Sequence, residues 1–136
     1  MIIPYQRIDY PTGTRYFPIL DLEILFPGRE LYLTKALVDS GSERSLFAKE
    51  ILDDSGIDVS SYPRGLGSGA GGVRLQTIFL PVFVRILGKR IRLDTNWMTM
   101  EPGSFNLLGR YDFFNKFRVI FDEPRRLMEI VPHEER

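Results

Sequence analysis

The chain has 136 residues, no cysteine and a formal net charge of zero, because 18 basic side chains balance 18 acidic ones. The lack of cysteine excludes disulfides, thiolate nucleophiles and zinc–thiolate sites. The balanced charge gives no general attraction to nucleic acid or to an anionic membrane. The single histidine, His133, stands in the tail segment 131–136, so a Ser-His-Asp triad and a multi-histidine metal site are excluded as well.

An enzyme with this composition has carboxylates, hydroxyls and lysines as its working groups, and we expect no cofactor and no metal ion. No stretch approaches the roughly 18 apolar residues of a membrane-spanning helix. Residues 1–11 lack the charged and apolar regions of a secretory signal. We therefore expect a cytoplasmic protein with no membrane partner and no nucleic-acid partner.

Alternating apolar residues predict that most of the chain forms β-strands. This two-residue period is found in residues 18–26, 31–38, 77–86 and 88–95, and residues 117–131 read as two strands joined by an Asp-Glu-Pro turn. Pro81 cannot donate a hydrogen bond, so the strand that contains it is expected to have a free edge there. The expected fold class is all-β, mostly β with one or two short helices, in a single domain over residues 1–136.

Two segments have helical periodicity. In residues 45–56 the apolar side chains share one helical face, Ser45 is expected to cap the start, and Gly56 is expected to end the helix in the left-handed conformation with Ile57 packing back. In residues 110–117 four aromatic side chains stand three or four positions apart. The simplest interpretation of this aromatic cluster is that it belongs to the core.

The tripeptide Asp-Ser-Gly occurs twice, at 39–41 and at 54–56. The second copy falls at the end of the first predicted helix, where glycine is common for backbone reasons. The first copy follows the apolar residues 36–38, so Asp39 is held on a tight turn at the edge of the core. Asp39 is either a catalytic carboxylate or a turn residue that accepts backbone N–H bonds.

The stretch 64–74 contains five glycines, and residues 67–72 formally match the dinucleotide fingerprint G-x-G-x-x-G. That fingerprint requires a helix afterwards, whereas residues 73–84 read as a strand, so no helix N-terminus receives a phosphate. Two interpretations remain. The stretch is a flexible loop, or it is a hairpin tip whose backbone approaches a ligand closely, as glycine permits.

The order of these motifs resembles that of the retropepsin-like aspartic proteases, the family of retroviral proteases and their bacterial relatives. The matching segments are residues 36–42, the glycine-rich loop 64–74, and residues 106–110, Asn-Leu-Leu-Gly-Arg. The resemblance extends over residues 15–131, and the helix after residue 45 is more typical of bacterial members. It implies a small closed β-barrel with one lobe per chain.

The resemblance also implies roles for individual residues. Asp39 would be the catalytic aspartate, Ser40 would hydrogen-bond across a two-fold axis, and Gly41 would permit the tight turn. The residues expected to support the catalytic loop are Ser42, which replaces the usual small apolar residue, Glu43, Leu108, Gly109 and Arg110. Glu43 and Arg110 would form an ion pair, with two unrelated surface charges as the alternative. The flap over the substrate would be Gly67, Ser68, Gly69, Ala70, Gly71 and Gly72.

Peptide hydrolysis by aspartate needs two carboxylates that share one proton. The chain has one qualifying aspartate and no internal repeat, so the second must come from Asp39 of another copy in a C2 homodimer. The first hypothesis is therefore a homodimeric endopeptidase acting on an extended peptide or protein substrate. The alternatives are a binding or dimerisation module of the same fold with little or no proteolysis, and a small β-barrel binding protein in which Asp39 is only a turn residue.

Overall fold

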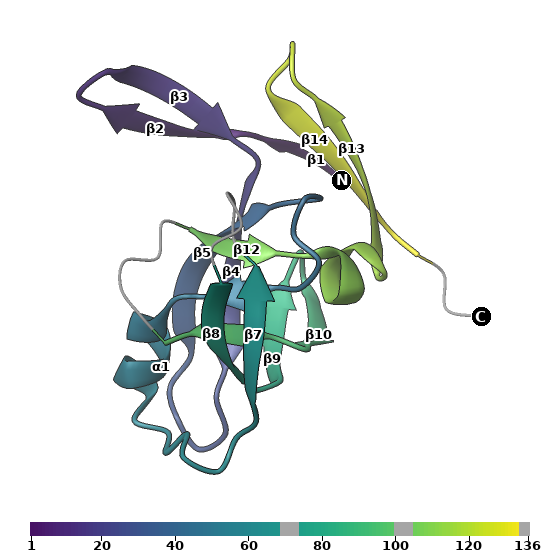
Figure 1. The fold of residues 1–136 in the computed structure, drawn as a ribbon. Coiled ribbons are helices and arrows are strands. Elements are labelled where there is room, and N and C mark those ends of the chain that lie inside the picture. Colours follow the sequence, from purple (N-terminus) through teal and green to yellow (C-terminus); the bar gives the residue numbers. More distant parts are fainter. Residues whose placement is uncertain (69–73, 100–104, 134–136) are drawn as a thin grey trace.

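The computed structural model describes residues 1–68, 74–99 and 105–133, and Figure 1 shows their arrangement. These described residues are mostly β-strand, with one short α-helix and one π-helical turn. The elements in chain order are β1 (Ile2–Pro4), β2 (Gln6–Tyr10), β3 (Gly13–Phe17), β4 (Ile19–Leu25), β5 (Tyr32–Val38), β6 (Leu46–Phe47), α1 (Lys49–Ser55), β7 (Arg64–Ser68), β8 (Arg74–Phe79), β9 (Val82–Ile86), β10 (Lys89–Leu93), β11 (Asn96–Met98), β12 (Asn106–Leu108), η2 (Arg110–Phe114), β13 (Phe117–Asp122) and β14 (Leu127–Pro132).

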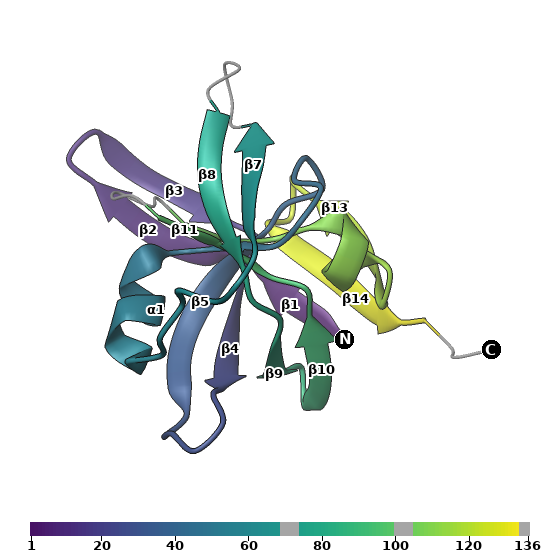
Figure 2. The ribbon, with the colours of Figure 1, turned by 60° about the horizontal axis from the view of Figure 1, so that its bottom comes forward.

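The largest sheet has nine strands in the order β10-β9-β4-β5-β12-β6-β11-β8-β7, and it curls into a half-barrel (Figure 2). The prediction of a closed barrel is wrong, because the end strands β10 and β7 do not pair with each other in the part of the chain described. On the outer edge of β10, the carbonyl oxygen of Arg92 accepts a hydrogen bond from Lys116 Nζ instead of from another strand. The all-β expectation is confirmed at the level of a mostly-β fold.

The predicted strand 77–86 is in fact two strands, β8 and β9, and the break falls at Leu80 and Pro81. Proline lacks a backbone N–H and cannot continue a ladder. The N–H of Leu80 donates instead to the carbonyl of Thr95 at 3.1 Å, and its carbonyl accepts the indole N–H of Trp97 at 2.9 Å. Pro81 thus separates two strands that lie on different parts of the curled sheet, where a free edge had been expected.

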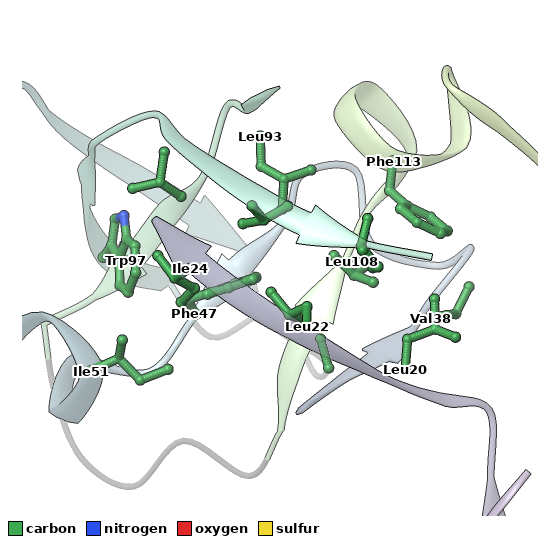
Figure 3. Packing of buried hydrophobic residues seen from close by; sticks show 14 of the residues in the cluster. Leu20, Leu22, Ile24, Val38, Phe47, Ile51, Leu93, Trp97, Leu108 and Phe113 are labelled. Atoms are coloured by element: carbon green, nitrogen blue, oxygen red, sulfur yellow. The ribbon is translucent and has the colours of Figure 1, made fainter. Parts of the chain in front are cut away.

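The core lies inside the curl, and its side chains come from alternate positions of the strands (Figure 3). Leu20, Leu22 and Ile24 of β4 all point inward and are almost completely buried. The rings of Phe47 and Trp97 meet edge to face at 5.4 Å between centroids, and both side chains are fully buried. Burial of a large apolar side chain contributes roughly 1.5–3 kcal/mol to the free energy of unfolding. The packing of these side chains therefore stabilises the curled sheet.

The two helical predictions differ in their outcome. The helix α1 ends at Gly56, which is left-handed with φ 68°, and Ile57 packs against the core as expected. Ser45 does not cap this helix, because α1 begins only at Lys49 after Ala48 and Ser45 is buried elsewhere. The second helix is the short turn η2, in which Phe113 is buried and stacks on Phe117 at 4.9 Å.

Two smaller β units project from the half-barrel on one side (Figure 1). The strands β1, β14 and β13 form a three-stranded sheet, named here the terminal sheet, and β2 and β3 form a separate two-stranded ribbon. An isolated two-stranded ribbon is marginally stable in water. The loop that follows β5 lies between these two units (Figures 1 and 2).

The aromatic cluster generates a stability prediction. Phe113→Ala removes a fully buried ring that stacks on Phe117, and we expect a loss of about 3–5 kcal/mol in the free energy of unfolding. Tyr111→Ala is the matched control, because the Tyr111 side chain is 57% exposed and its removal is expected to cost much less. Urea denaturation of both variants measures the difference, and equal losses would contradict the assignment of the core.

Candidate functional site

Asp39 occupies the first position after β5, at the end of a strand in the middle of the large sheet. The strand β5 lies beside β12 in parallel, with Val38 opposite Leu108, and the N–H of Asp39 donates to the carbonyl of Leu108 at 3.1 Å. The side chains of Val38 and Leu108 are buried side by side at this end of the core (Figure 3). The position of Asp39 is therefore fixed by the sheet and not by the loop alone.

Residues 39–42 form a tight turn around the Asp39 carboxylate. The N–H of Ser42 donates to the carbonyl of Asp39 at 3.1 Å, and the N–H of Gly41 donates to Asp39 Oδ1 at 2.9 Å. A Cβ atom at Gly41 would lie 3.1 Å from the same Oδ1. Glycine thus lets the backbone approach the carboxylate, while Asp39 stays half-buried and Ser40 is exposed. The Gly41 bond also agrees with the turn-residue alternative.

The segment 108–111 lies against this turn and holds it by its backbone. The N–H of Arg110 donates to the carbonyl of Ser42 at 2.9 Å, and the N–H of Tyr111 donates to the carbonyl of Glu43 at 2.9 Å. A Cβ atom at Gly109 would lie 2.3 Å from the carbonyl carbon of Arg44, which is closer than any side chain permits. The sequence motif at 108–110 and the Asp39 loop are therefore in direct contact.

The expected ion pair between Glu43 and Arg110 is not formed among the side chains that the structure describes. Both side chains are exposed, and the two residues are joined only through the neighbouring backbone bonds. The guanidinium that does contact this segment is that of Arg44, which lies 5.2 Å from the centre of the Tyr111 ring. The alternative of two separate surface charges therefore describes Glu43 and Arg110 better.

A buried polar pair, which was not predicted from the sequence, lies beneath the loop. Ser45 Oγ accepts the N–H of Gly109 at 3.0 Å and donates to Asp112 Oδ1 at 2.6 Å. Asp112 Oδ1 also accepts the N–H of Phe113 at 2.8 Å, while its Oδ2 is buried without a partner in the described structure. The sequence feature that could have indicated this pair is Asp112, an acidic residue among the aromatic residues of segment 111–114.

Burial raises the pKa of the Asp112 carboxyl above its ordinary value, because the charged form loses its hydration. The hydrogen bonds from Ser45 and Phe113 and the positive charge of Lys116 oppose this shift, but the desolvation is larger. One oxygen of the carboxyl group accepts two hydrogen bonds, whereas the other has no partner in the described structure.

The glycine-rich stretch begins in a β-hairpin. The strand β7 contains Gly67 and Ser68, which lie opposite Leu75 and Arg74 of β8; Gly69, Ala70, Gly71 and Gly72 lie outside the described residues. Because a strand and not a helix follows the stretch, the dinucleotide interpretation has no helix N-terminus to use. In both views β7 runs toward the side on which the Asp39 loop lies (Figures 1 and 2).

The second Asp-Ser-Gly triplet is part of the helix end. Ser55 Oγ donates to the carbonyl of Leu52 at 2.6 Å, and Asp54 Oδ2 accepts a hydrogen bond from the Tyr32 hydroxyl at 3.2 Å. Gly56 supplies the left-handed residue that terminates α1. Each member of this triplet thus has a structural role at the end of α1.

No family model matches this chain, and no curated protein matches it. The family resemblance noted in the sequence therefore depends on its own residues. Within the residues that the structure describes, no group of three or more histidine, cysteine, aspartate and glutamate side chains is placed to hold a metal ion. No helix in the same part of the chain is long and apolar enough to cross a membrane.

The buried serine generates the next prediction. Ser45→Ala leaves the Gly109 N–H and the Asp112 carboxyl without this partner, and an unsatisfied buried polar group costs about 1–3 kcal/mol. Ser42→Ala is the control, because the Ser42 hydroxyl makes an exposed bond to the Arg44 carbonyl. Thermal denaturation is expected to show a clear loss for Ser45→Ala and a small one for Ser42→Ala. The reverse order would contradict the proposed support of the loop.

Asp112 is expected to make the stability of the protein depend on pH. Because its pKa is raised in the folded state, the folded protein binds more protons than the unfolded chain above pH 3.8, and stability falls as the pH rises through the folded pKa. The free energy of unfolding of the wild type relative to Asp112→Asn should therefore decrease from acidic to neutral pH. Urea titrations at several pH values test this, and a difference that increases with pH would contradict it.

Proposed function

We propose that the chain is an aspartic endopeptidase whose catalytic dyad consists of Asp39 from two subunits. The observation that carries the proposal is the Asp39 turn itself. Its carboxylate is half-buried at the end of a central strand, and backbone bonds from the segment 108–111 fix the turn. Catalysis by carboxylates requires this combination of accessibility and rigid placement. The resemblance to retropepsin-like proteases supports the same assignment, with each chain forming one lobe of that type.

The second carboxylate is proposed to come from a second copy of the chain. Asp54, in the other triplet, is engaged by Tyr32 at the end of α1. A two-fold axis beside residues 39–42 would place the same aspartate twice. The outer face of the terminal sheet supports association, because Ile2 and Ile120 flank Glu129 there in register and are 65% and 43% exposed.

The reaction follows from two adjacent carboxyl groups that share one proton, since like charges so close do not both ionise. The ionised carboxylate takes a proton from a water molecule, whose oxygen attacks the scissile carbonyl carbon. The protonated carboxyl donates its proton to the carbonyl oxygen and stabilises the tetrahedral intermediate. The intermediate then breaks its C–N bond as a proton passes to the amide nitrogen, giving an acid and an amine.

The substrate proposed is an extended peptide or protein segment, which would lie as an added strand beneath the hairpin of β7 and β8. The flap would be residues 67–72. No cofactor or metal ion takes part in this mechanism. A binding or dimerisation module with little or no proteolysis is one alternative. A binding protein in which Asp39 is only a turn residue is another, and it is favoured by the bond from the Gly41 N–H to Asp39 Oδ1, which a turn-forming aspartate would also make.

The two triplets provide the test. Asp39→Asn keeps the shape of the side chain but removes the base, so we expect loss of cleavage of a peptide library at mildly acidic pH by more than about a hundredfold, with the fold intact. Asp54→Asn is the matched control and should be nearly silent. Excess Asp39→Asn chain mixed with wild type, after subunit exchange, should also suppress activity.

The outcomes separate the alternatives. Equal damage from both substitutions would contradict the assignment of Asp39. A dimer that cleaves no peptide in the wild type would indicate the binding module. Active wild type that is unaffected by exchange with the variant would show that one chain suffices.

A further inference from the structure

A basic groove lies on the opposite edge of the half-barrel from β7. It has a volume of about 910 Å³, and it is lined by the cationic side chains of Lys89, Arg90, Arg92 and Lys116 and by His133. The first three stand on β10, whereas Lys116 and His133 come from the turn before β13 and from the residue after β14. None of the described residues that line this groove is acidic. The chain as a whole is neutral, so this concentration of positive charge is local.

The wall formed by β10 is a free edge of the large sheet, because among the strands that the structure describes β10 pairs only with β9. Leu87 and Gly88 join the two strands in a tight turn with φ 53° and 73°. In such a two-residue hairpin the residues that flank the turn, Ile86 and Lys89, are hydrogen-bonded to each other. Hydrogen-bonded and non-hydrogen-bonded pairs alternate along an antiparallel ladder. The backbone N–H and C=O groups of Arg90 and Arg92 therefore point away from β9. The bond from Lys116 Nζ to the Arg92 carbonyl agrees with this alternation.

The charges of the groove are only partly neutralised. Arg92 has an ion pair with Asp94 at 3.2 Å, in which both side chains are more than half exposed. The guanidinium of Arg90 lies 4.4 Å from the centre of the Phe83 ring and so keeps its charge at the surface. Charged residues on an edge strand also prevent edge-to-edge aggregation. That role explains β10 alone, but it does not explain Lys116 on the facing wall.

We propose that the basic groove binds an acidic polypeptide segment in an extended conformation, which adds as a strand to the free edge of β10. The exposed N–H and C=O of Arg90 would pair with the backbone of the segment, and the cations of both walls would meet its carboxylates. A polypeptide suits this edge better than a nucleic acid, because only a polypeptide offers alternating backbone donors and acceptors to a strand. This site is separate from Asp39, so the inference goes beyond the proposed protease activity.

Fluorescence anisotropy with a labelled six-residue peptide of alternating glutamate and valine tests the proposal on the full-length wild type and on Asp39→Asn. Saturable binding is expected for both. Lys89→Glu combined with Arg90→Glu should weaken binding at least about tenfold, since two attractions become repulsions. Arg7→Glu combined with Arg15→Glu is the control, because it makes the same change of charge on the β2–β3 ribbon and should leave binding unchanged.

A second probe examines the backbone pairing. The same peptide with alternate amides N-methylated keeps its charge but loses its donors, and its binding should also fall about tenfold. Unchanged binding of this probe, equal binding by both double variants, or tighter binding of a single-stranded oligonucleotide than of the peptide would each overturn the proposal. Circular dichroism establishes that the variants are folded, and cleavage of a neutral peptide by the Lys89→Glu, Arg90→Glu variant separates this result from the protease hypothesis.

Discussion

The parallel pairing of β5 with β12 is the interaction on which the candidate site depends. It places Val38 beside Leu108, so that the chain leaves β5 and β12 at neighbouring points. From there three further contacts follow: the N–H of Arg110 and that of Tyr111 each bond the loop backbone, and Gly109 packs directly on Arg44. Two segments about seventy residues apart in sequence are thus joined into one unit, which carries the half-buried Asp39 carboxylate.

The buried pair of Ser45 and Asp112 extends that unit into the core. A carboxyl group with a raised pKa and one unpartnered oxygen carries an energetic cost. The position of this carboxyl group explains why the fold contains it, because Ser45, which donates a hydrogen bond to Asp112, also accepts one from the Gly109 N–H. The polar pair therefore fixes the relative orientation of the two segments where apolar side chains would leave the Gly109 N–H unsatisfied.

Local sequence patterns predicted most of the strands and helices, but they could not predict contacts between residues that are far apart in the sequence. The alternation of β4 and β5, the end of α1 at Gly56 and the aromatic turn before β13 all follow from spacing and backbone preference. The hydrogen-bond partner of Ser45 could not be predicted from local patterns. A serine before an apolar helix is equally typical of a helix cap, and its actual partner, Asp112, is distant in sequence. The open half-barrel was missed for the same reason: closure depends on whether β10 meets β7, and no local pattern contains that information.

The central claim is that two copies of Asp39 act on one substrate. It is tested most directly by a crystal structure of the protein with a peptide analogue that carries a hydroxyl in place of the scissile amide. The account predicts one analogue bound to two chains, with both Asp39 carboxylates within hydrogen-bonding distance of that hydroxyl across a two-fold axis. An analogue bound to a single chain, or bound away from Asp39, would contradict it.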